Sequence, residues 1–268
     1  MWEGDVWVAL RAARAAADIV QTGFFQALDT EMKGAVDPVT QVDRDAEIAI
    51  REVIGSHFPD DAILGEEQGG GDWRYGRVWI VDPLDGTVNY LHRLPQVAVS
   101  IALWNDGAPL VGVIVDVARN DEYVAVVGGG ATLNGQAIQV SETPTLDQSL
   151  VSTGFPYDRR QHAAAYLRVV EEVMLNSQGT RRLGAAALDL AWLATGQYDA
   201  YWEHGGIHGI KPWDVAAGIL LVTEAGGTYT NESGETNQLE ARAHVASNGK
   251  VHEELRSIVA RTMPEHLK

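Results

Sequence analysis

The sequence has 268 residues, of which 46% are hydrophobic, and its 37 Asp and Glu against 20 Lys and Arg give a formal net charge of −17. This charge repels the phosphate backbone of nucleic acids and argues against nucleic-acid binding as the main activity. The absence of cysteine excludes disulfides, thiolate metal sites and a cysteine nucleophile. No apolar stretch is long enough to span a membrane and the first residues lack a signal-peptide pattern, so we expect a cytoplasmic protein with no membrane partner. We expect one domain, residues 1–268, with possible halves 1–140 and 141–268.

The first third of the chain predicts two helices, a loop and a strand. Apolar residues recur at helical spacing from Val6 to Val20 and from Ala46 to Ile54. Gly69-Gly70-Gly71 is interpreted as a flexible loop, with a mobile flap beside the site as the functional alternative. Val78 to Val81 is a short unbroken apolar run, which is typical of a strand buried on both faces.

The rest of the chain continues this mixed α/β pattern. Ser100 to Trp104 and Val111 to Val117 favour strands, and Asn134-Gly135 is a hairpin-turn signal. Asp158 to Asn176 and Trp213 to Ala225 favour helices.

The most informative segment follows the strand at Val78 to Val81. The strand ends in Asp82, Pro83 blocks its continuation, Asp85 follows, and Gly86-Thr87 opens a short predicted helix. Ligands bind at strand carboxyl ends in open α/β sheets. Two carboxylates aimed at one point are costly unless cations neutralise them, and free N–H groups at a helix start suit a phosphate. The segment therefore predicts a metal and a phosphate together, whereas Asp85-Gly86 alone would indicate an ordinary turn.

Three further acidic segments are weaker evidence for a metal site when each is considered alone. Glu66 and Glu67 follow a short apolar run, where a solvated loop is the alternative. Asp214 opens an apolar helix and Asp37 to Asp43 precede another, and at both places helix capping is the ordinary explanation.

Together these segments resemble the inositol monophosphatase family, in the same order along nearly the whole chain. The matching motifs are Gly65-Glu66-Glu67, Asp82-Pro83-Leu84-Asp85-Gly86-Thr87 and Trp213 to Gly218, with supporting matches at Asp37 to Asp43, Asn89 to Pro95, Asn134-Gly135, Gly184 to Ala187 and Glu224 to Gly227. The resemblance implies a layered αβαβα sandwich of the inositol monophosphatase and fructose-1,6-bisphosphatase type. It also implies a homodimer that hydrolyses small phosphate monoesters with Mg²⁺ and is sensitive to lithium.

The resemblance further implies about two or three Mg²⁺ ions per active site. By position, Glu66, Asp82 and the Leu84 carbonyl would hold the first ion, while Asp82, Asp85 and Asp214 would hold the second. Ligand sets made only of oxygen suit Mg²⁺, and the lack of cysteine and of a histidine-rich cluster argues against zinc.

The implied mechanism uses three catalytic residues. A water on the Glu66 side attacks phosphorus, and Thr87, oriented by Asp43, helps to take its proton. The second metal stabilises the leaving alkoxide, and the N–H groups of Gly86 and Thr87 hold phosphate oxygens.

The residues that would contact the alcohol part of the substrate are Gly184, Ala185, Ala186 and Glu203. Arg181 belongs to the same region, although a surface salt bridge would equally explain it. The segment from His204 to Pro212 is longer than the family pattern. It would therefore either move Glu203 away from the pocket or bring His204 or His208 toward it.

The expected substrate is a small phosphorylated polyol, with inositol 1-phosphate foremost. Val88 to His92 resemble the inositol monophosphatase branch rather than the 3′-phosphoadenosine phosphatases. Histidinol phosphate and broad sugar phosphates, including fructose bisphosphate, stay open as alternatives. A function of a different class, as a partner protein of the transcription machinery, also stays open.

Overall fold

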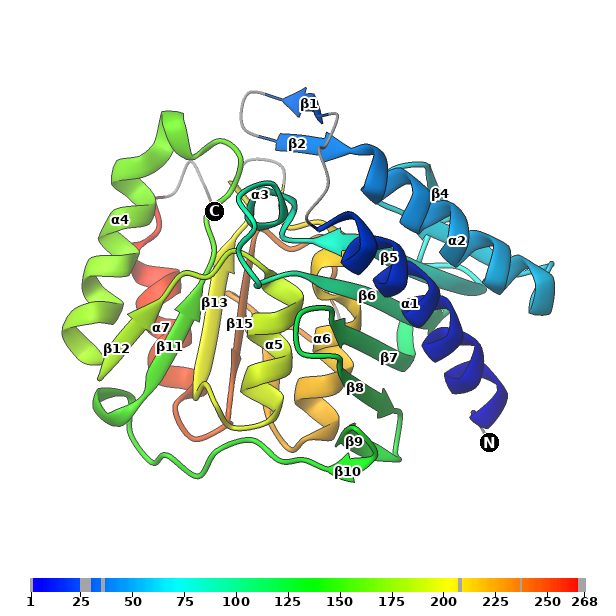
Figure 1. Ribbon diagram of the computed structural model, residues 1–268. Coiled ribbons are helices and arrows are strands. Elements are labelled where there is room, and N and C mark those ends of the chain that lie inside the picture. The colour runs from blue at the N-terminus through cyan, green and yellow to red at the C-terminus, as the bar shows by residue number, and fades with distance from the viewer. Residues whose placement is uncertain (1, 25–29, 35–36, 207–208, 237, 265–268) are drawn as a thin grey trace.

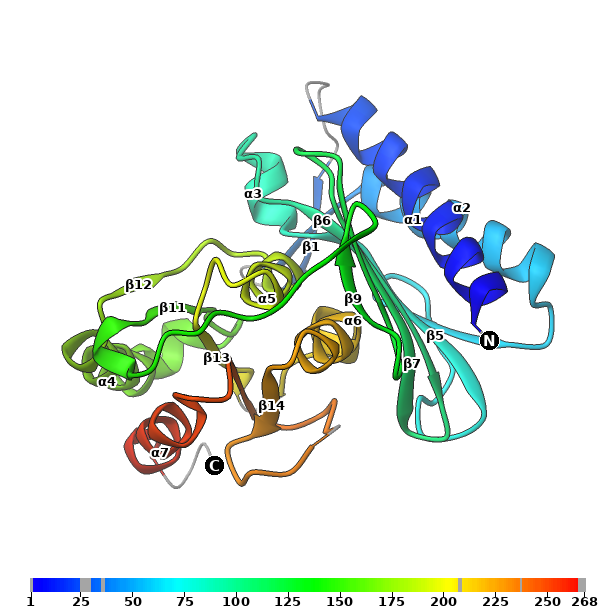
Figure 2. The same ribbon diagram turned by 90° about the horizontal axis from the view of Figure 1, so that it is seen from below.

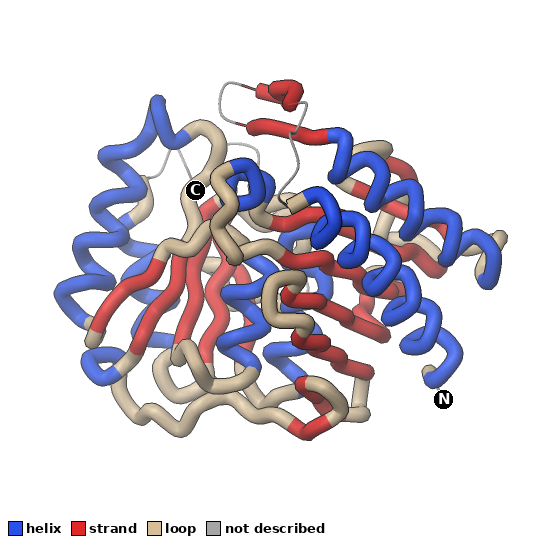
Figure 3. The backbone as a smooth tube through the Cα atoms, in the orientation of Figure 1, coloured by secondary structure: helices blue, strands red, loops and turns tan. Residues whose placement is uncertain are grey.

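The computed structural model describes residues 2–24, 30–34, 37–206, 209–236 and 238–264 (Figure 1). Helices and sheets alternate in layers, and the layered α/β sandwich expected from the sequence is confirmed (Figures 2 and 3). Among the described residues, no helix has the length and apolar character needed to cross a membrane.

The first part of the chain forms the outer helices, the larger sheet, a separate two-stranded sheet of β1 and β2, and the short helix α3. Its elements are α1 (Glu3–Gly23), β1 (Thr30–Gly34), β2 (Asp37–Thr40), α2 (Gln41–His57), β3 (Ala62–Gly65), β4 (Gly69–Gly70), β5 (Arg77–Asp85), α3 (Thr87–Leu91), β6 (Ala98–Asn105), β7 (Ala108–Asp116), β8 (Asp121–Val126), β9 (Gly130–Leu133) and β10 (Gln136–Ala137).

The second part forms the smaller sheet and the remaining helices. Its elements are a 3-10 turn (Leu146–Gln148), β11 (Leu150–Thr153), α4 (Arg159–Asn176), β12 (Gly179–Arg181), α5 (Ala186–Ala194), β13 (Ala200–His204), α6 (Pro212–Glu224), β14 (Thr228–Asn231), β15 (Ala243–Ser247) and α7 (His252–Thr262). The possible division near residue 140 falls in the segment that joins the two sheets.

The larger sheet has the strand order β10-β9-β8-β7-β6-β5-β3-β4. Helices α1 and α2 pack against β5, β6 and β7 on one face. The alanine-rich buried side of α1, with Ala9, Ala12 and Ala16 fully buried, contributes small side chains to this layer.

The smaller sheet has the order β12-β11-β13-β15-β14, and helices α4 and α7 cover its outer face. Helices α5 and α6 lie between the two sheets (Figure 2). A helix in such a central layer must be apolar on most of its surface, and α6 is buried continuously from Val215 to Val222. Gly218 permits close packing, because a Cβ there would lie 2.3 Å from Leu190 of α5.

Strand β5 carries Asp82 and Asp85, two of the predicted metal-binding residues. Its residues from Val78 to Asp85 are all buried, and it pairs in parallel with β3 and antiparallel with β6. The pairing with β6 shifts register between Asp82 and Asp85. Such irregularities bend a strand and change the direction of its side chains, so the last residues of β5 depart from simple strand alternation.

One local prediction is wrong. Gly69 and Gly70, expected in a flexible loop, form edge strand β4 and pair with Gly65 and Leu64. Gly70 has φ +130°, and a Cβ there would lie 2.0 Å from the Ile63 carbonyl oxygen, so glycine is used here for close backbone approach. These residues do not line the cavity described below.

The other local predictions agree with the structure. Asn134 and Gly135, with φ +51° and +76°, form the two-residue turn between β9 and β10. The predicted late helices correspond to α4, which kinks at His162, and to α6.

Candidate active site

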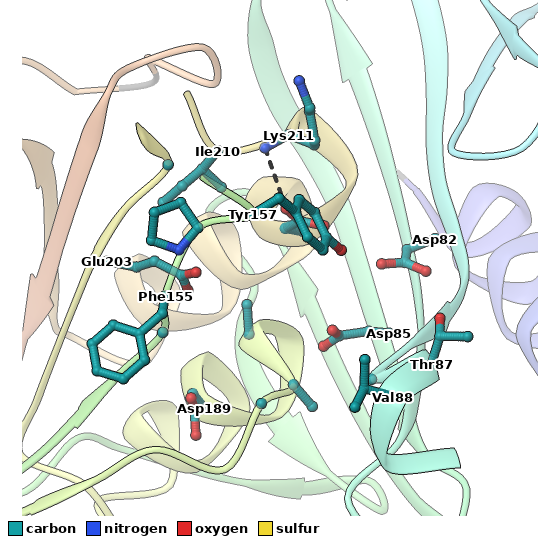
Figure 4. A pocket seen from close by; sticks show the side chains of 18 of the residues that line it. Asp82, Asp85, Thr87, Val88, Phe155, Tyr157, Asp189, Glu203, Ile210 and Lys211 are labelled. Atoms are coloured by element: carbon teal, nitrogen blue, oxygen red, sulfur yellow. Dashed lines mark hydrogen bonds between the residues drawn. The ribbon is translucent and has the colours of Figure 1, made fainter. Parts of the chain in front are cut away.

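A cavity of about 470 Å³ lies where β5 ends, beside the central helices (Figure 4). Every residue predicted to bind metal lines this cavity: Glu66, Asp82, Leu84, Asp85 and Asp214. They come from the turn after β3, the end of β5 and the first turn of α6. The structure thus brings together carboxylates that lie far apart in the sequence.

Glu66 is positioned by a carboxylate that the sequence analysis missed. Buried Glu47 of α2 accepts the N–H groups of Glu67 at 2.7 Å and of Gln68 at 3.1 Å, and it pairs with Arg51 at 2.8 Å. A Cβ on Gly65 would lie 2.4 Å from the Glu47 carboxylate, so glycine is required beside this anchor. The turn that carries Glu66 is therefore tied to α2.

Backbone N–H groups hold the other carboxylates. Asp82 accepts the N–H of Leu84 at 3.0 Å, and Asp85 accepts the N–H of Ala187, in the first turn of α5, at 2.7 Å. Asp214 accepts the N–H of Lys211 at 3.2 Å. Asp214 is therefore a helix cap, as its sequence position suggested, and it also lines the cavity.

The carboxylates destabilise one another's charged forms. Burial raises the pKa of Asp82 well above its usual value, and the charges of Glu66, Asp85 and Asp214 raise it further. Burial and neighbouring carboxylates likewise raise the pKa of Asp214. Burial is also the main cause that raises the pKa of Asp85 to about 7, although the hydrogen bond from Ala187 lowers it. Such a cluster is stabilised by a bound cation.

The donor set fits Mg²⁺, because it consists of carboxylates and a backbone carbonyl. Of the residues that the structure describes, no three acidic or histidine side chains already surround one point at metal-ligand spacing. One oxygen of Asp82, of Asp85 and of Asp214 is bound to a backbone N–H. The second oxygen of each carboxylate remains available to a metal ion.

Thr87 and Asp43 are in contact although 44 positions separate them. The Thr87 hydroxyl donates to Asp43 Oδ1 at 3.1 Å and also lies 3.2 Å from the Leu84 carbonyl oxygen. The other oxygen of Asp43 accepts the N–H of Thr40, the N-cap of α2, at 2.9 Å. Burial raises the pKa of Asp43, while the hydrogen bonds from Thr40 and Thr87 lower it.

The residues predicted on the substrate side also line the cavity: Gly86, Gly184, Ala185, Ala186 and Glu203. Glu203 is half-buried and accepts the hydroxyl of Tyr201 at 2.7 Å. The long segment after β13 therefore leaves Glu203 at the cavity.

The alternative expectation was that His204 or His208 would lie at the cavity. His204 is buried, accepts the N–H of Gly206 at 2.9 Å through Nδ1, and lies with its ring centre 5.6 Å from that of Tyr166 on α4. It does not line the cavity. His208 lies outside the described residues.

Several cavity residues were missed from the sequence. Arg182, rather than the neighbouring Arg181, lines the cavity, as do Arg159, Lys211 and Asp189. Asp189 is 2% exposed, and burial raises its pKa well above the usual value. Its position within the apolar helix Ala186–Ala194 was a signal that could have identified it.

The sequence and the fold of this chain are similar to those of known proteins. A sequence model of the inositol monophosphatase family matches residues 4–266. A Pseudomonas aeruginosa protein named Nus factor SuhB is 39% identical over 272 residues, which cover 97% of each chain. The crystal structure of extragenic suppressor protein suhB from Bartonella henselae has a TM-score of 0.89 at 34% identity, covering 96% of this chain and 98% of that one. The structure of inositol monophosphatase from Anabaena has a TM-score of 0.84 at 37% identity, covering 98% of each chain.

Proposed function

The chain belongs to the inositol monophosphatase family, and from this we propose that it is a Mg²⁺-dependent phosphomonoesterase acting on small phosphorylated polyols. Among monophosphates, inositol 1-phosphate is the foremost proposed substrate. The observation that carries the proposal is that Glu66, Asp82, Asp85 and Asp214 line one cavity beside the Thr87–Asp43 pair.

We assign Glu66, Asp82 and the Leu84 carbonyl to one Mg²⁺ and Asp82, Asp85 and Asp214 to another. Bound Mg²⁺ supplies positive charge that offsets the phosphate and makes water more acidic. The carboxylates contribute by holding that charge at the reacting end of the cavity.

Thr87 takes part in proton transfer. Its hydroxyl donates to Asp43, which leaves the Thr87 oxygen able to accept a hydrogen bond from the attacking water. Asp43 is itself fixed by Thr40, so the direction of the Thr87 hydroxyl is set before substrate binds.

Phosphate oxygens are assigned to the N–H groups of Gly86 and Thr87. Gly86 has φ +93°, and a Cβ there would lie 2.6 Å from the Gln96 carbonyl oxygen. A larger residue at this position would therefore disturb the turn that presents both N–H groups.

Replacing Glu66 by Gln is expected to lower kcat/KM for inositol 1-phosphate by at least about tenfold, because a carboxylate assigned to metal and water is lost. Glu67→Gln is the matched control, since it makes the same change one residue away and Glu67 does not line the cavity. Initial rates of phosphate release measure kcat/KM for both variants. An equal loss in the two variants would contradict the role assigned to Glu66.

Glu203→Gln is expected to lower kcat/KM for inositol 1-phosphate more than for a simple aryl phosphate. Glu203 is the assigned acceptor for substrate hydroxyls. A substrate without these hydroxyls leaves the carboxylate without a hydrogen-bond partner, so Glu203 favours the polyol phosphate over the aryl phosphate. Steady-state kinetics with the two substrates measure the difference. An equal response would remove Glu203 from substrate recognition and favour a specialist activity, with histidinol phosphate foremost.

A partner role in the transcription machinery is the alternative from a different class, because a close relative carries the name Nus factor. A screen for phosphate release from inositol phosphates, histidinol phosphate, fructose bisphosphate and nucleotides tests the proposed function. Release from none of these substrates with Mg²⁺ present would overturn the enzyme proposal and favour the partner role. The homodimer and sensitivity to lithium stay predictions.

A further inference from the structure

Two arginines contribute positive charge to the cavity wall. Arg159 opens α4 and Arg182 follows β12, and both line the cavity. Within the described part of the chain, neither forms an ion pair, although the net charge is −17. Eight other arginines are paired with carboxylates: Arg14, Arg44, Arg51, Arg74, Arg77, Arg119, Arg256 and Arg261. Some surface arginines are also without an ion pair among the described residues, but they do not line the cavity. Among the residues that the structure describes, Arg159 and Arg182 are therefore two unpaired arginines at the same cavity, which Lys211 also lines.

The two guanidinium groups act on each other. Burial lowers the pKa of Arg159, and the positive charge of Arg182 lowers it further. Arg159 donates one hydrogen bond, to the Pro156 carbonyl at 3.1 Å, and Arg182 lies 5.7 Å from the centre of the Phe155 ring. Most of their N–H groups are therefore available to a ligand, and an anion between them would relieve the repulsion.

Arg182 lies away from the proposed reacting centre. Figure 4 shows Phe155, over which Arg182 lies, on the opposite side of the cavity from Asp82 and Thr87. Arg182 is close enough to Glu203 for its charge to lower the pKa of that carboxyl, yet no ion pair forms. An anion held by the arginines would be separate from the phosphate held at Asp82 and Thr87.

We propose that Arg159 and Arg182 bind a second phosphate group of the substrate, so that the cavity favours small polyol or sugar bisphosphates over the corresponding monophosphates. The planar guanidinium groups suit phosphate because each can donate two hydrogen bonds. This proposal rests on the proposed phosphatase function and specifies the substrate class for the same cavity.

The test compares two substrate pairs that differ by one phosphate: inositol 1-phosphate with inositol 1,4-bisphosphate, and fructose 1-phosphate with fructose 1,6-bisphosphate. In the wild type, the bisphosphate of at least one pair is expected to have the higher kcat/KM. Arg159→Gln and Arg182→Gln are each expected to reduce this advantage by about tenfold. The pair with the larger reduction identifies the backbone, inositol or sugar, that fits the cavity.

Arg160→Gln is the matched control, because it removes the same charge one residue from Arg159 and Arg160 does not line the cavity. It is expected to leave the bisphosphate advantage unchanged. Equal losses for monophosphate and bisphosphate in the Arg159 and Arg182 variants would overturn the proposal, since they would indicate general attraction of anions into the cavity. Absence of any bisphosphate advantage in the wild type would overturn it as well.

A binding measurement separates this proposal from the proposed function. Isothermal titration of the metal-free protein in EDTA with each bisphosphate requires no turnover. If the wild type hydrolyses nothing but binds a bisphosphate more tightly than Arg182→Gln does, the phosphatase function is wrong and the phosphate site stands. Equal affinities of the wild type and Arg182→Gln would overturn the site.

Discussion

Replacing Asp82 by Asn is expected to lower turnover of inositol 1-phosphate below about a tenth of the wild-type value, a loss of at least about 1.4 kcal/mol in transition-state stabilisation. Asp82 is assigned to both metal ions, so its loss disturbs both. The fold should be preserved, because an amide oxygen can still accept the N–H of Leu84. The metal-free variant should unfold at the same temperature as the wild type or higher, since a charge that repels Glu66, Asp85 and Asp214 has been removed.

Initial rates of phosphate release and thermal unfolding in EDTA measure the two effects. Asp45→Asn is the control, because it removes one carboxylate charge at an exposed position of α2 that does not line the cavity. Retention of more than about a tenth of wild-type turnover by Asp82→Asn would contradict the assignment of Asp82 to the metals.

Adding Mg²⁺ to the chelated wild-type protein is expected to raise its Tm, because an ion that binds only the folded state stabilises it by mass action. The gain is about 2.7 kcal/mol when free Mg²⁺ is a hundred times the Kd. Asp82→Asn should lose most of this shift, whereas Asp45→Asn should keep it. An equal Mg²⁺ shift in Asp82→Asn and the wild type would place the ion elsewhere.

The same experiment has an expected pH dependence. The pKa of Asp85 is raised to about 7 in the metal-free protein, so folding favours its protonated form. The stability that Asp85 contributes is complete below the pKa of the unfolded state and is lost as pH rises through about 7. The fall in Tm between pH 5 and pH 8 should therefore be larger in EDTA than with saturating Mg²⁺.

Features encoded within one short segment could be predicted from the sequence. The apolar run before Asp82 predicts a buried strand, and the Asn134-Gly135 dipeptide predicts a hairpin, because both signals depend on neighbouring residues. Gly69 and Gly70 were misread because a glycine run is also compatible with an edge strand. Glycine is needed at Gly70 because the Ile63 carbonyl on the paired strand leaves no room for a Cβ.

The residues of the site could be predicted only in part from the sequence. The acidic motifs identified the residues at the cavity, but only through resemblance to a family, since each segment alone also fits capping or a solvated loop. The other residues of the site are positioned by tertiary contacts. Glu47 anchors the turn at Glu66 from another element, and Arg182 rather than the neighbouring Arg181 lines the cavity. Neither fact follows from local spacing.

We propose above that the carboxylate cavity hydrolyses phosphate monoesters with Mg²⁺. The most direct test measures phosphate release from inositol 1-phosphate by exhaustively chelated wild-type protein as Mg²⁺ is added back. We expect no release above background in EDTA and a saturable rise with Mg²⁺. Full activity after chelation, or no activity at any Mg²⁺ concentration, would contradict it.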